Sequence, residues 1–230
     1  HYANRFLRTD AYRAAKRGRR RAEFGSGGGY LKRLLALVTG SGTDNANVHV
    51  AKLGGEYVAL TELPERIAFD PLSLDTHGTV TYDDGWPGQH YTAHLVRDRE
   101  AGVTFEYATA YGRDNAYHVY RLPDGTRTRE RVVKISVDRP AYLHSVGVSG
   151  EYVILVEPPF TVDPMDFLKP GGDGFISHYE WQPERGTRVL VIHRETGERV
   201  VERRLDPFFV FHHVNAFEHP DHDAVVVDLI

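Results

Sequence analysis

Short apolar runs separated by turn residues dominate the chain from about residue 47 to its end. The runs are rich in valine, isoleucine, tyrosine and phenylalanine, a composition typical of β-strands. They cover residues 47–51, 57–61, 66–69, 79–82, 103–107, 118–120, 131–135, 152–156, 187–192 and 224–227. Between them lie turn-forming sequences such as Gly-Gly at 54–55 and Pro-Asp-Gly at 123–125. Many short strands without helices between them predict an all-β sandwich, barrel or propeller.

The first part of the chain has a different character. Up to about residue 21 it is polar, and alanines among arginines and lysines favour a helix or loop. A glycine-rich stretch at 25–29 then precedes a short helical pattern at 30–37. These glycines do not form a phosphate-binding loop, because no strand precedes them and no Gly-Lys-Ser/Thr follows. We therefore expect an N-terminal helical and loop segment at 1–46 and β-structure at 47–230.

One internal similarity favours the propeller. The sequence Gly-Glu-Tyr-Val-Ala-Leu-Thr-Glu at 55–62 resembles Gly-Glu-Tyr-Val-Ile-Leu-Val-Glu at 150–157. A proline, a short apolar run and an Asp-Pro pair follow each copy. Repeated strand-and-turn units are typical of propellers, whose blades are small antiparallel sheets of about 40–50 residues. The two copies are either two blades apart or unrelated.

Composition excludes several classes of function. The net charge of -4 gives no basic surface for nucleic acid. The chain has no cysteine, which excludes disulfides, thiolate metal sites and a cysteine nucleophile. No apolar stretch approaches the roughly 18 residues that cross a bilayer, and the N-terminus lacks the apolar region of a signal peptide. These features predict a cytoplasmic protein that is soluble or attached to a membrane surface.

Histidine is abundant, with 13 residues, and each one has a structural and a chemical interpretation. Those beside turn, polar or charged residues are interpreted as solvent-facing: His1, His49, His77, His90, His193, His219 and His222. Two that adjoin aromatic strand residues, His118 and His178, are assigned to surface packing. Three others, His94, His144 and His212, lie in apolar, strand-like runs. A polar ring is costly there unless it has a partner.

These three histidines are either core residues that bond to backbone carbonyls or ligands of one metal ion. Their spacing is not a local metal motif such as His-Glu-x-x-His. A propeller, however, brings the inner strands of successive blades around one axis, so ligands can come from distant runs. Neutral imidazoles suit Fe(II), copper or zinc. The residues alone do not choose among these metals.

The segments around these histidines resemble the carotenoid cleavage oxygenases. The resemblance rests on Asn-Val-His-Val at 47–50, Leu-Thr-Glu at 60–62, Thr-Ala-His at 92–94, Leu-His-Ser at 143–145 and Phe-His-His-Val-Asn-Ala-Phe-Glu at 211–218. It runs in order from about residue 4 to residue 230, and the last motif is the most specific. That family includes carotene-to-retinal dioxygenases, apocarotenoid oxygenases, lignostilbene dioxygenases and the vertebrate retinoid isomerase. The opening of the chain resembles a haloarchaeal carotene-cleaving member.

The resemblance implies a seven-bladed propeller that holds Fe(2+) on its axis with four histidines. His94, His144 and His212 match three of them. His212 is chosen over His213 because the family places this ligand three residues before an asparagine, here Asn215. The fourth family histidine lies close to the C-terminus of full-length members and has no counterpart in this sequence. We therefore expect a C-terminally truncated chain that forms part of a propeller.

The resemblance also implies residues that support the metal and the substrate. Glu62 matches a glutamate that bonds the far nitrogen of a ligand histidine and so fixes its tautomer. Glu218, in the last motif, belongs either to the site or to packing between blades. Phe160, Tyr142 and Phe209 are candidate linings of an apolar substrate tunnel. A lipid-soluble substrate implies peripheral contact with a membrane.

The activity implied is that of a non-haem Fe(2+) dioxygenase that cleaves a conjugated C=C bond of a carotenoid with O2, for example β-carotene to retinal. One alternative is cleavage of an apocarotenoid or a stilbene-like substrate by the same fold. Another is a non-catalytic propeller that acts as a binding module, with the three histidines in its core. A zinc hydrolase would need only three histidines and a water, but the sequence indicates no base for it.

Overall fold

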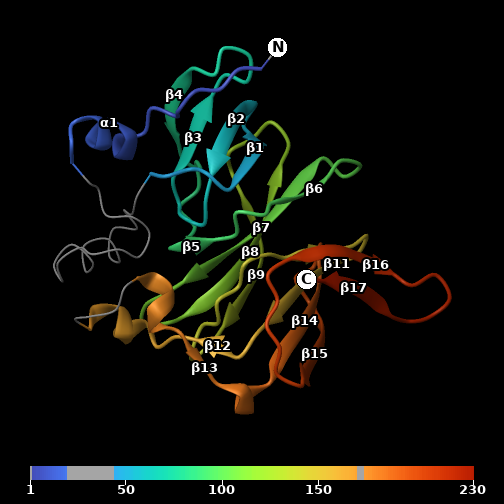
Figure 1. Ribbon diagram of the computed structural model, residues 1–230. Helices are drawn as coiled ribbons and strands as arrows, with labels where there is room; N and C mark the ends of the chain where they lie inside the picture. The colour runs from blue at the N-terminus through green and yellow to red at the C-terminus, as the bar shows by residue number, and fades with distance from the viewer. Residues whose placement is uncertain (1, 20–43, 170–173) are drawn as a thin grey trace.

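The computed structural model describes residues 2–19, 44–169 and 174–230 (Figure 1). The glycine-rich stretch at 25–29 and the helical pattern at 30–37 lie outside the described residues. The polar opening of the chain forms one short helix, α1 (Asp10–Lys16). Its N-terminus is capped by Thr9, whose side-chain oxygen accepts a hydrogen bond from the backbone N of Tyr12 at 3.0 Å.

Sheet 1 is an antiparallel meander of β1 (His49–Leu53), β2 (Glu56–Leu60), β3 (Arg66–Phe69) and β4 (Thr76–Val80). Gly54 and Gly55 form the turn between β1 and β2, with φ angles of 56° and 90°. Positive φ at both central positions defines the type I′ hairpin, which glycine adopts without steric cost. The turn pairs Leu53 with Glu56 and so sets the register of the whole hairpin.

Sheet 2 contains β5 (His90–Tyr91), β6 (Val96–Asp98), β7 (Val103–Ala110), β8 (Ala116–Pro123) and β9 (Glu130–Ser136). The strand order is β5-β7-β8-β9, and β6 also pairs with β7. Strands β5 and β6 pair with opposite ends of β7. The edge of this sheet is therefore interrupted at residues 92–95, where the chain is free to leave the ladder.

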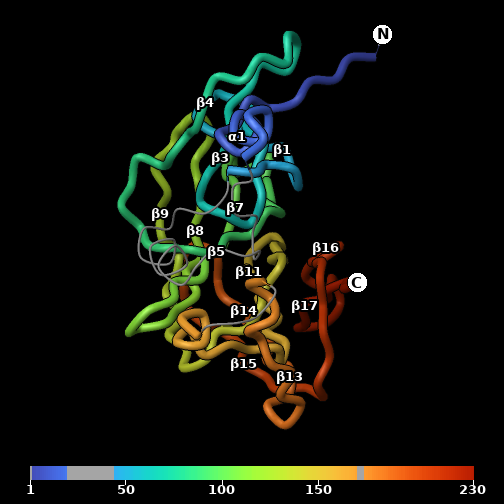
Figure 2. The backbone as a smooth tube through the Cα atoms, turned by 60° about the vertical axis from the view of Figure 1, so that its left-hand side comes forward, coloured from blue at the N-terminus to red at the C-terminus, as the bar shows by residue number. Residues whose placement is uncertain are grey.

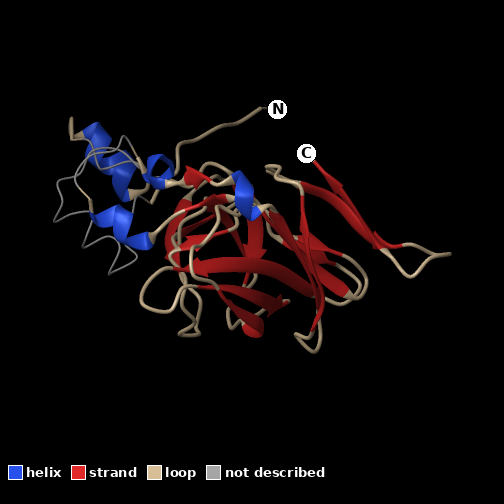
Figure 3. Ribbon diagram, turned by 90° about the horizontal axis from the view of Figure 1, so that it is seen from below, coloured by secondary structure: helices blue, strands red, loops and turns tan. Residues whose placement is uncertain are grey.

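Sheet 3 contains β10 (Gly147–Val148), β11 (Tyr152–Glu157), β14 (Thr187–His193) and β15 (Arg199–Leu205), in that order. Between β11 and β14 lie the pair β12 (Phe160–Thr161) and β13 (Glu180–Trp181) and three short 3₁₀ helices: η1 (Pro164–Leu168), η2 (Phe175–His178) and η3 (Pro183–Arg185). A last hairpin, β16 (His213–Glu218) and β17 (Val225–Leu229), projects from the body of the sheets (Figure 3).

These sheets follow one another along the chain as propeller blades do (Figures 1 and 2). The two similar segments of the sequence contain β2 and β11, which are the second strands of sheets 1 and 3. They are therefore two blades apart, with sheet 2 between them. The expectation of an all-β, propeller-type fold is confirmed; the described residues form separate blades and no closed ring.

All ten predicted runs overlap strands. The prediction did not include the short strands β5, β6, β10, β12 and β13 or the longer strands β15 and β16. Every residue of β15 is exposed, so its sequence carries no alternation of apolar and polar positions. Backbone pairing with β14 holds it in the sheet. Pattern alone does not identify such an edge strand.

Apolar side chains fill the space between neighbouring sheets. One cluster joins sheets 1 and 2 and contains Leu53, Val58, Leu60, Ala68, Val80, Ala93 and Leu122. A larger one joins sheets 2 and 3 and contains Phe105, Tyr107, Tyr117, Val119, Ile135, Ala141, Leu143, Val146, Val153, Leu155, Leu190 and Ile192. Burial of this apolar surface holds the blades together side by side.

A buried ionic cluster reinforces the contact between sheets 1 and 2. Glu106 on β7 binds Arg66 on β3 at 3.0 Å and Arg129, next to β9, at 3.1 Å. Arg129 also binds Asp84 at 2.6 Å. Both guanidinium groups lie over the ring of Tyr82, at 4.6 and 3.9 Å from its centroid. The two arginines and two carboxylates balance each other in charge, as burial requires.

We expect Glu106→Gln to reduce the free energy of unfolding by about 3–5 kcal/mol, because it leaves two buried arginines short of one negative charge. Glu130→Gln is the matched control, since Glu130 pairs with Arg121 at 2.7 Å but is largely exposed. Its loss should cost less than about 1 kcal/mol. Urea unfolding measures both. Equal effects of the two substitutions would contradict this account of the cluster.

Candidate metal centre

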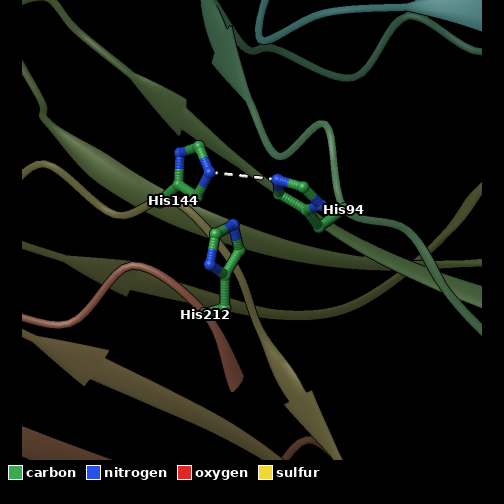
Figure 4. Close-up of side chains that lie close together, drawn as sticks. All are labelled: His94, His144 and His212. Carbon is green, nitrogen blue, oxygen red and sulfur yellow. Dashed lines mark hydrogen bonds between the residues drawn. The ribbon is translucent and has the colours of Figure 1, made fainter. Parts of the chain in front are cut away.

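The structure brings His94, His144 and His212 together from three separate parts of the fold (Figure 4). His94 lies where the edge of sheet 2 is interrupted, between β5 and β6. His144 lies just before β10, the edge strand of sheet 3, and His212 just before β16. Each of the three histidines therefore lies in a segment next to an edge strand, at the start of its own sheet or hairpin.

One nitrogen from each of the three rings lies within 4.8 Å of the other two. The Nε2 atoms of His94 and His144 are 3.0 Å apart. Two imidazole nitrogens bound at right angles to one ion, each at about 2.1 Å, would be about 3.0 Å apart. The ring centroids are separated by 4.7, 4.8 and 5.0 Å. The donor set thus fits a single transition-metal ion.

Two buried hydroxyls hold these three segments in place. Thr92 Oγ1 donates to the backbone oxygen of His144 at 3.0 Å and accepts from the backbone N of His94 at 2.9 Å. Ser145 Oγ donates to the oxygen of Phe211 at 2.8 Å and accepts from the N of His213 at 2.9 Å. These contacts give a structural reason for the threonine of the Thr-Ala-His motif and the serine of the Leu-His-Ser motif.

Glu62 supports His144 from the side opposite the convergence point. Its Oε1 lies 2.6 Å from Nδ1 of His144, and the hydroxyl of Tyr142 lies 3.0 Å from both carboxylate oxygens. A carboxylate next to Nδ1 places the proton there and leaves Nε2 free to bind a metal. Burial alone would raise the pKa of Glu62, but the rings of His144 and His90 outweigh it and lower that pKa to about 2.

His94 is kept neutral by its surroundings. Burial lowers its pKa, and the neighbouring rings of His144 and His212 lower it further, to about 4. A neutral imidazole is the form that binds metal ions. The site is therefore ready for a cation at neutral pH without first losing a proton from this ring.

The three residues expected to line a tunnel lie in one aromatic cluster beside His144. Tyr142 stacks on Phe209 with a centroid separation of 6.4 Å, and Phe160 meets Phe209 edge-on at 6.0 Å. Phe211 continues the row, 4.9 Å from Phe209 and 5.1 Å from the ring of His144. The row of Phe160, Phe209 and Phe211 thus ends on the candidate metal centre.

Two residues of the last sequence motif have structural roles. His213 is not one of the three convergent rings, and its Nδ1 lies 2.8 Å from Ser145 Oγ. Glu218 accepts hydrogen bonds from Ser149 Oγ at 2.6 Å and from the backbone N of Glu151 at 2.8 Å. The carboxylate joins β16 to the turn between β10 and β11. Glu218 therefore stabilises the contact between β16 and this turn.

The burial of three histidines was not predicted from the sequence. His90, interpreted as solvent-facing, is only 1% exposed and lies 3.5 Å from Glu62 Oε2. His118, assigned to surface packing, is also buried. His49, interpreted as solvent-facing, is half-buried with its ring 6.1 Å from that of His94. A period-two pattern could have found His90, because it alternates with Thr92 and His94.

Comparisons with known proteins show which family the chain belongs to. The model of the retinal pigment epithelial membrane protein family matches residues 1–230. Carotenoid isomerooxygenase of Drosophila melanogaster is 28% identical over 246 residues, which cover 99% of this chain and 39% of that protein. Carotenoid cleavage dioxygenase 8 homolog A of Oryza sativa is 32% identical over 243 residues, covering 98% of this chain and 43% of that protein.

Solved structures show the same fold. Cobalt-substituted apocarotenoid oxygenase of Synechocystis superposes with a TM-score of 0.77 at 21% identity, over 98% of this chain and 48% of that one. Lignostilbene dioxygenase of Pseudomonas brassicacearum gives 0.72 at 25% identity, over 100% of this chain and 48% of that one. The chain spans less than half the length of these relatives. It belongs to the retinal pigment epithelial membrane protein family, the family of the carotenoid oxygenases, and the resemblance predicted from its sequence is confirmed.

Glu62→Gln should weaken divalent-metal binding by about 10–100-fold, because the amide is a poorer acceptor for the Nδ1 proton of His144. Glu56→Gln, at a half-buried position on β2 where the carboxylate lies 3.7 Å from Nδ1 of His77, is the control and should leave affinity unchanged. Competition titration against a fluorescent chelator measures the dissociation constants. Equal affinity of the Glu62 variant and the parent protein would show that this carboxylate does not act on the site.

Proposed function

We propose that this chain forms the metal-binding part of a dioxygenase that holds Fe(2+) through His94, His144 and His212 and cleaves a conjugated double bond of a carotenoid. The observation that carries this proposal is the convergence of three imidazoles, one of them fixed by Glu62 on its far nitrogen. The names of the relatives, carotenoid isomerooxygenase and carotenoid cleavage dioxygenase, supply the reaction class.

The donor set supports iron more than hydrolytic zinc. A zinc hydrolase needs a base beside the metal-bound water. The carboxylate nearest to the three rings, among the described residues, is engaged by His144 and Tyr142 behind the site. When bound, Fe(2+) would supply activation of O2, so that the double bond breaks and each of its carbons becomes a carbonyl carbon with one oxygen atom.

The residues of the chain orient the substrate and exclude water. A polyene is long, flat and apolar, and the rings of Phe160, Phe209 and Phe211 offer stacking surfaces of the same kind. Phe211 meets the ring of His144 edge-on, so a polyene lying along this row would pass beside the metal. Such orientation of the reacting bond is the main contribution a protein scaffold makes to this chemistry.

A related candidate is cleavage of an apocarotenoid or a stilbene-like compound. The fold-level similarity to apocarotenoid oxygenase and lignostilbene dioxygenase favours it. Both substrate types have a conjugated double bond and an apolar body, and both would use the same three histidines. Product analysis separates the substrates.

The test uses the protein expressed from its full reading frame, purified without oxygen and loaded with Fe(2+). We expect about one equivalent of bound iron and O2-dependent conversion of β-carotene to aldehydes, detected by chromatography with ¹⁸O2 label in the products. His144→Ala should lose both, because it removes a ligand and its link to Glu62. His213→Asn is the matched control: this neighbour of His212 is not one of the three convergent rings, so the variant should keep bound iron.

Three results would overturn the proposal. Stoichiometric zinc without oxygenase activity would support a hydrolase. A folded protein that binds no divalent metal would support a binding module. A protein that binds iron but cleaves only apocarotenoids or stilbenes would support the related candidate function in place of carotenoid cleavage.

We also propose peripheral membrane contact, because a carotenoid reaches an enzyme from a lipid phase. No helix among the described residues is long and apolar enough to span a bilayer. Met165, Ile176 and Trp181 are exposed on the segment that includes η1, η2 and β13, and β13 pairs with β12, which carries Phe160. Co-sedimentation with liposomes should decrease in a Met165→Ser/Ile176→Ser variant. Unchanged sedimentation of this variant, or none with the parent protein, would contradict the contact.

A further inference from the structure

Glu62 has a second histidine neighbour besides His144. The Nε2 atom of His90 lies 3.5 Å from Oε2 of Glu62, while Nδ1 of His144 lies 2.6 Å from Oε1. The carboxylate therefore sits between two imidazoles, one on each oxygen. The hydroxyl of Tyr142 is 3.0 Å from both oxygens and does not distinguish them.

His90 is buried in a position that needs a polar partner. Its side chain is 1% exposed, and neither ring nitrogen has a hydrogen-bond partner within ordinary bonding distance in the described part of the chain. A buried polar atom without a partner destabilises the folded state, because it has lost its hydrogen bonds to water. Glu62 Oε2 is a carboxylate oxygen within reach of Nε2, at 3.5 Å. The ring is held toward it by aromatic contacts with Tyr142 at 5.4 Å and Phe175 at 5.6 Å.

The backbone fixes the same geometry. The N–H of Tyr91 donates to the backbone oxygen of Glu62 at 2.9 Å, so β5 is joined at this point to the segment that follows β2. His90 and His94 belong to one alternating run, in which Thr92 already ties His94 to the His144 segment. The run at 90–94 therefore supplies the candidate ligand His94. Through His90, the same run also faces Glu62, the carboxylate that supports the second candidate ligand.

We propose that His90 is a positioning residue, which holds the Glu62 carboxylate in the rotation that keeps Oε1 on Nδ1 of His144. The terminal torsion of a glutamate is broad, so its carboxylate rotates readily unless both oxygens are fixed. His144 alone fixes one oxygen, and an N–H of His90 directed at Oε2 fixes the other. This inference rests on the proposed function, since it treats His144 as a metal ligand.

The test is a cobalt(II) titration of the protein expressed from its full reading frame, followed by the visible absorption of the bound ion. His90→Phe keeps an aromatic ring against Tyr142 and Phe175 but has no N–H donor. We expect it to weaken cobalt binding about tenfold and to change the absorption bands. His90→Gln retains an N–H and should restore affinity to within about threefold of the parent protein.

His118→Leu is the matched control. His118 is 2% exposed and its Nδ1 also has no partner among the described residues, but it lies on β8 and stacks on Tyr120. Loss of this buried histidine should leave cobalt affinity and spectrum unchanged. Thermal unfolding confirms that each variant is folded, and His90→Leu replaces His90→Phe if the latter does not fold.

A double-mutant cycle tests whether His90 acts through Glu62. In the Glu62→Gln background, His90→Phe should add less than about a twofold loss, because the acceptor it positions is already weakened. Full additivity of the two losses would overturn the inference. So would normal cobalt binding by His90→Phe, or a His90→Gln variant as weak as His90→Phe, which would show a packing role only.

The outcomes also separate this inference from the proposed function. If the parent protein binds no cobalt, the metal site itself fails and the role of His90 fails with it. If the parent protein binds cobalt and loses it on His144→Ala, while His90→Phe binds normally, the metal site stands and only the inference is overturned.

Discussion

The geometry of the site depends on two buried hydroxyls that join the histidine-bearing segments. Thr92 connects the His94 segment to the backbone at His144, and Ser145 connects that segment to the backbone N of His213. The strands next to these segments, β5, β6 and β10, have only two or three residues each. Ladder hydrogen bonds alone would hold such short edges weakly. The hydroxyl contacts therefore supply the rigidity that three convergent rings require.

Among the described residues, Glu62 has its ionic contacts with histidines and none with an arginine. Glu62 and Arg66 are four residues apart, yet they serve different buried clusters. Arg66 is neutralised by Glu106 between sheets 1 and 2, which anchors the start of β3. Glu62 is left to the imidazoles of His144 and His90. The carboxylate can thus act on a candidate ligand ring, because no arginine among the described residues pairs with it.

The sequence predicted the strands that have alternating or apolar patterns, because burial of one face determines both pattern and structure. It did not predict β15, whose residues are all exposed. The contact between Glu62 and His144 joins positions 82 residues apart and follows from tertiary structure alone. His90 was misread because its sequence neighbours are polar, although the fold buries it behind Glu62. Resemblance to a family, in contrast, identified the three convergent histidines directly.

The proposed metal site requires that three imidazoles bind one ion. Anomalous diffraction at the iron edge, from crystals of the protein grown with Fe(2+), tests it most directly. An ion bound by all three rings should give a single strong peak about 2.0–2.2 Å from Nε2 of His94, His144 and His212. A peak at another place would contradict it. So would a clean map in which these nitrogens bond only to water or to backbone carbonyls.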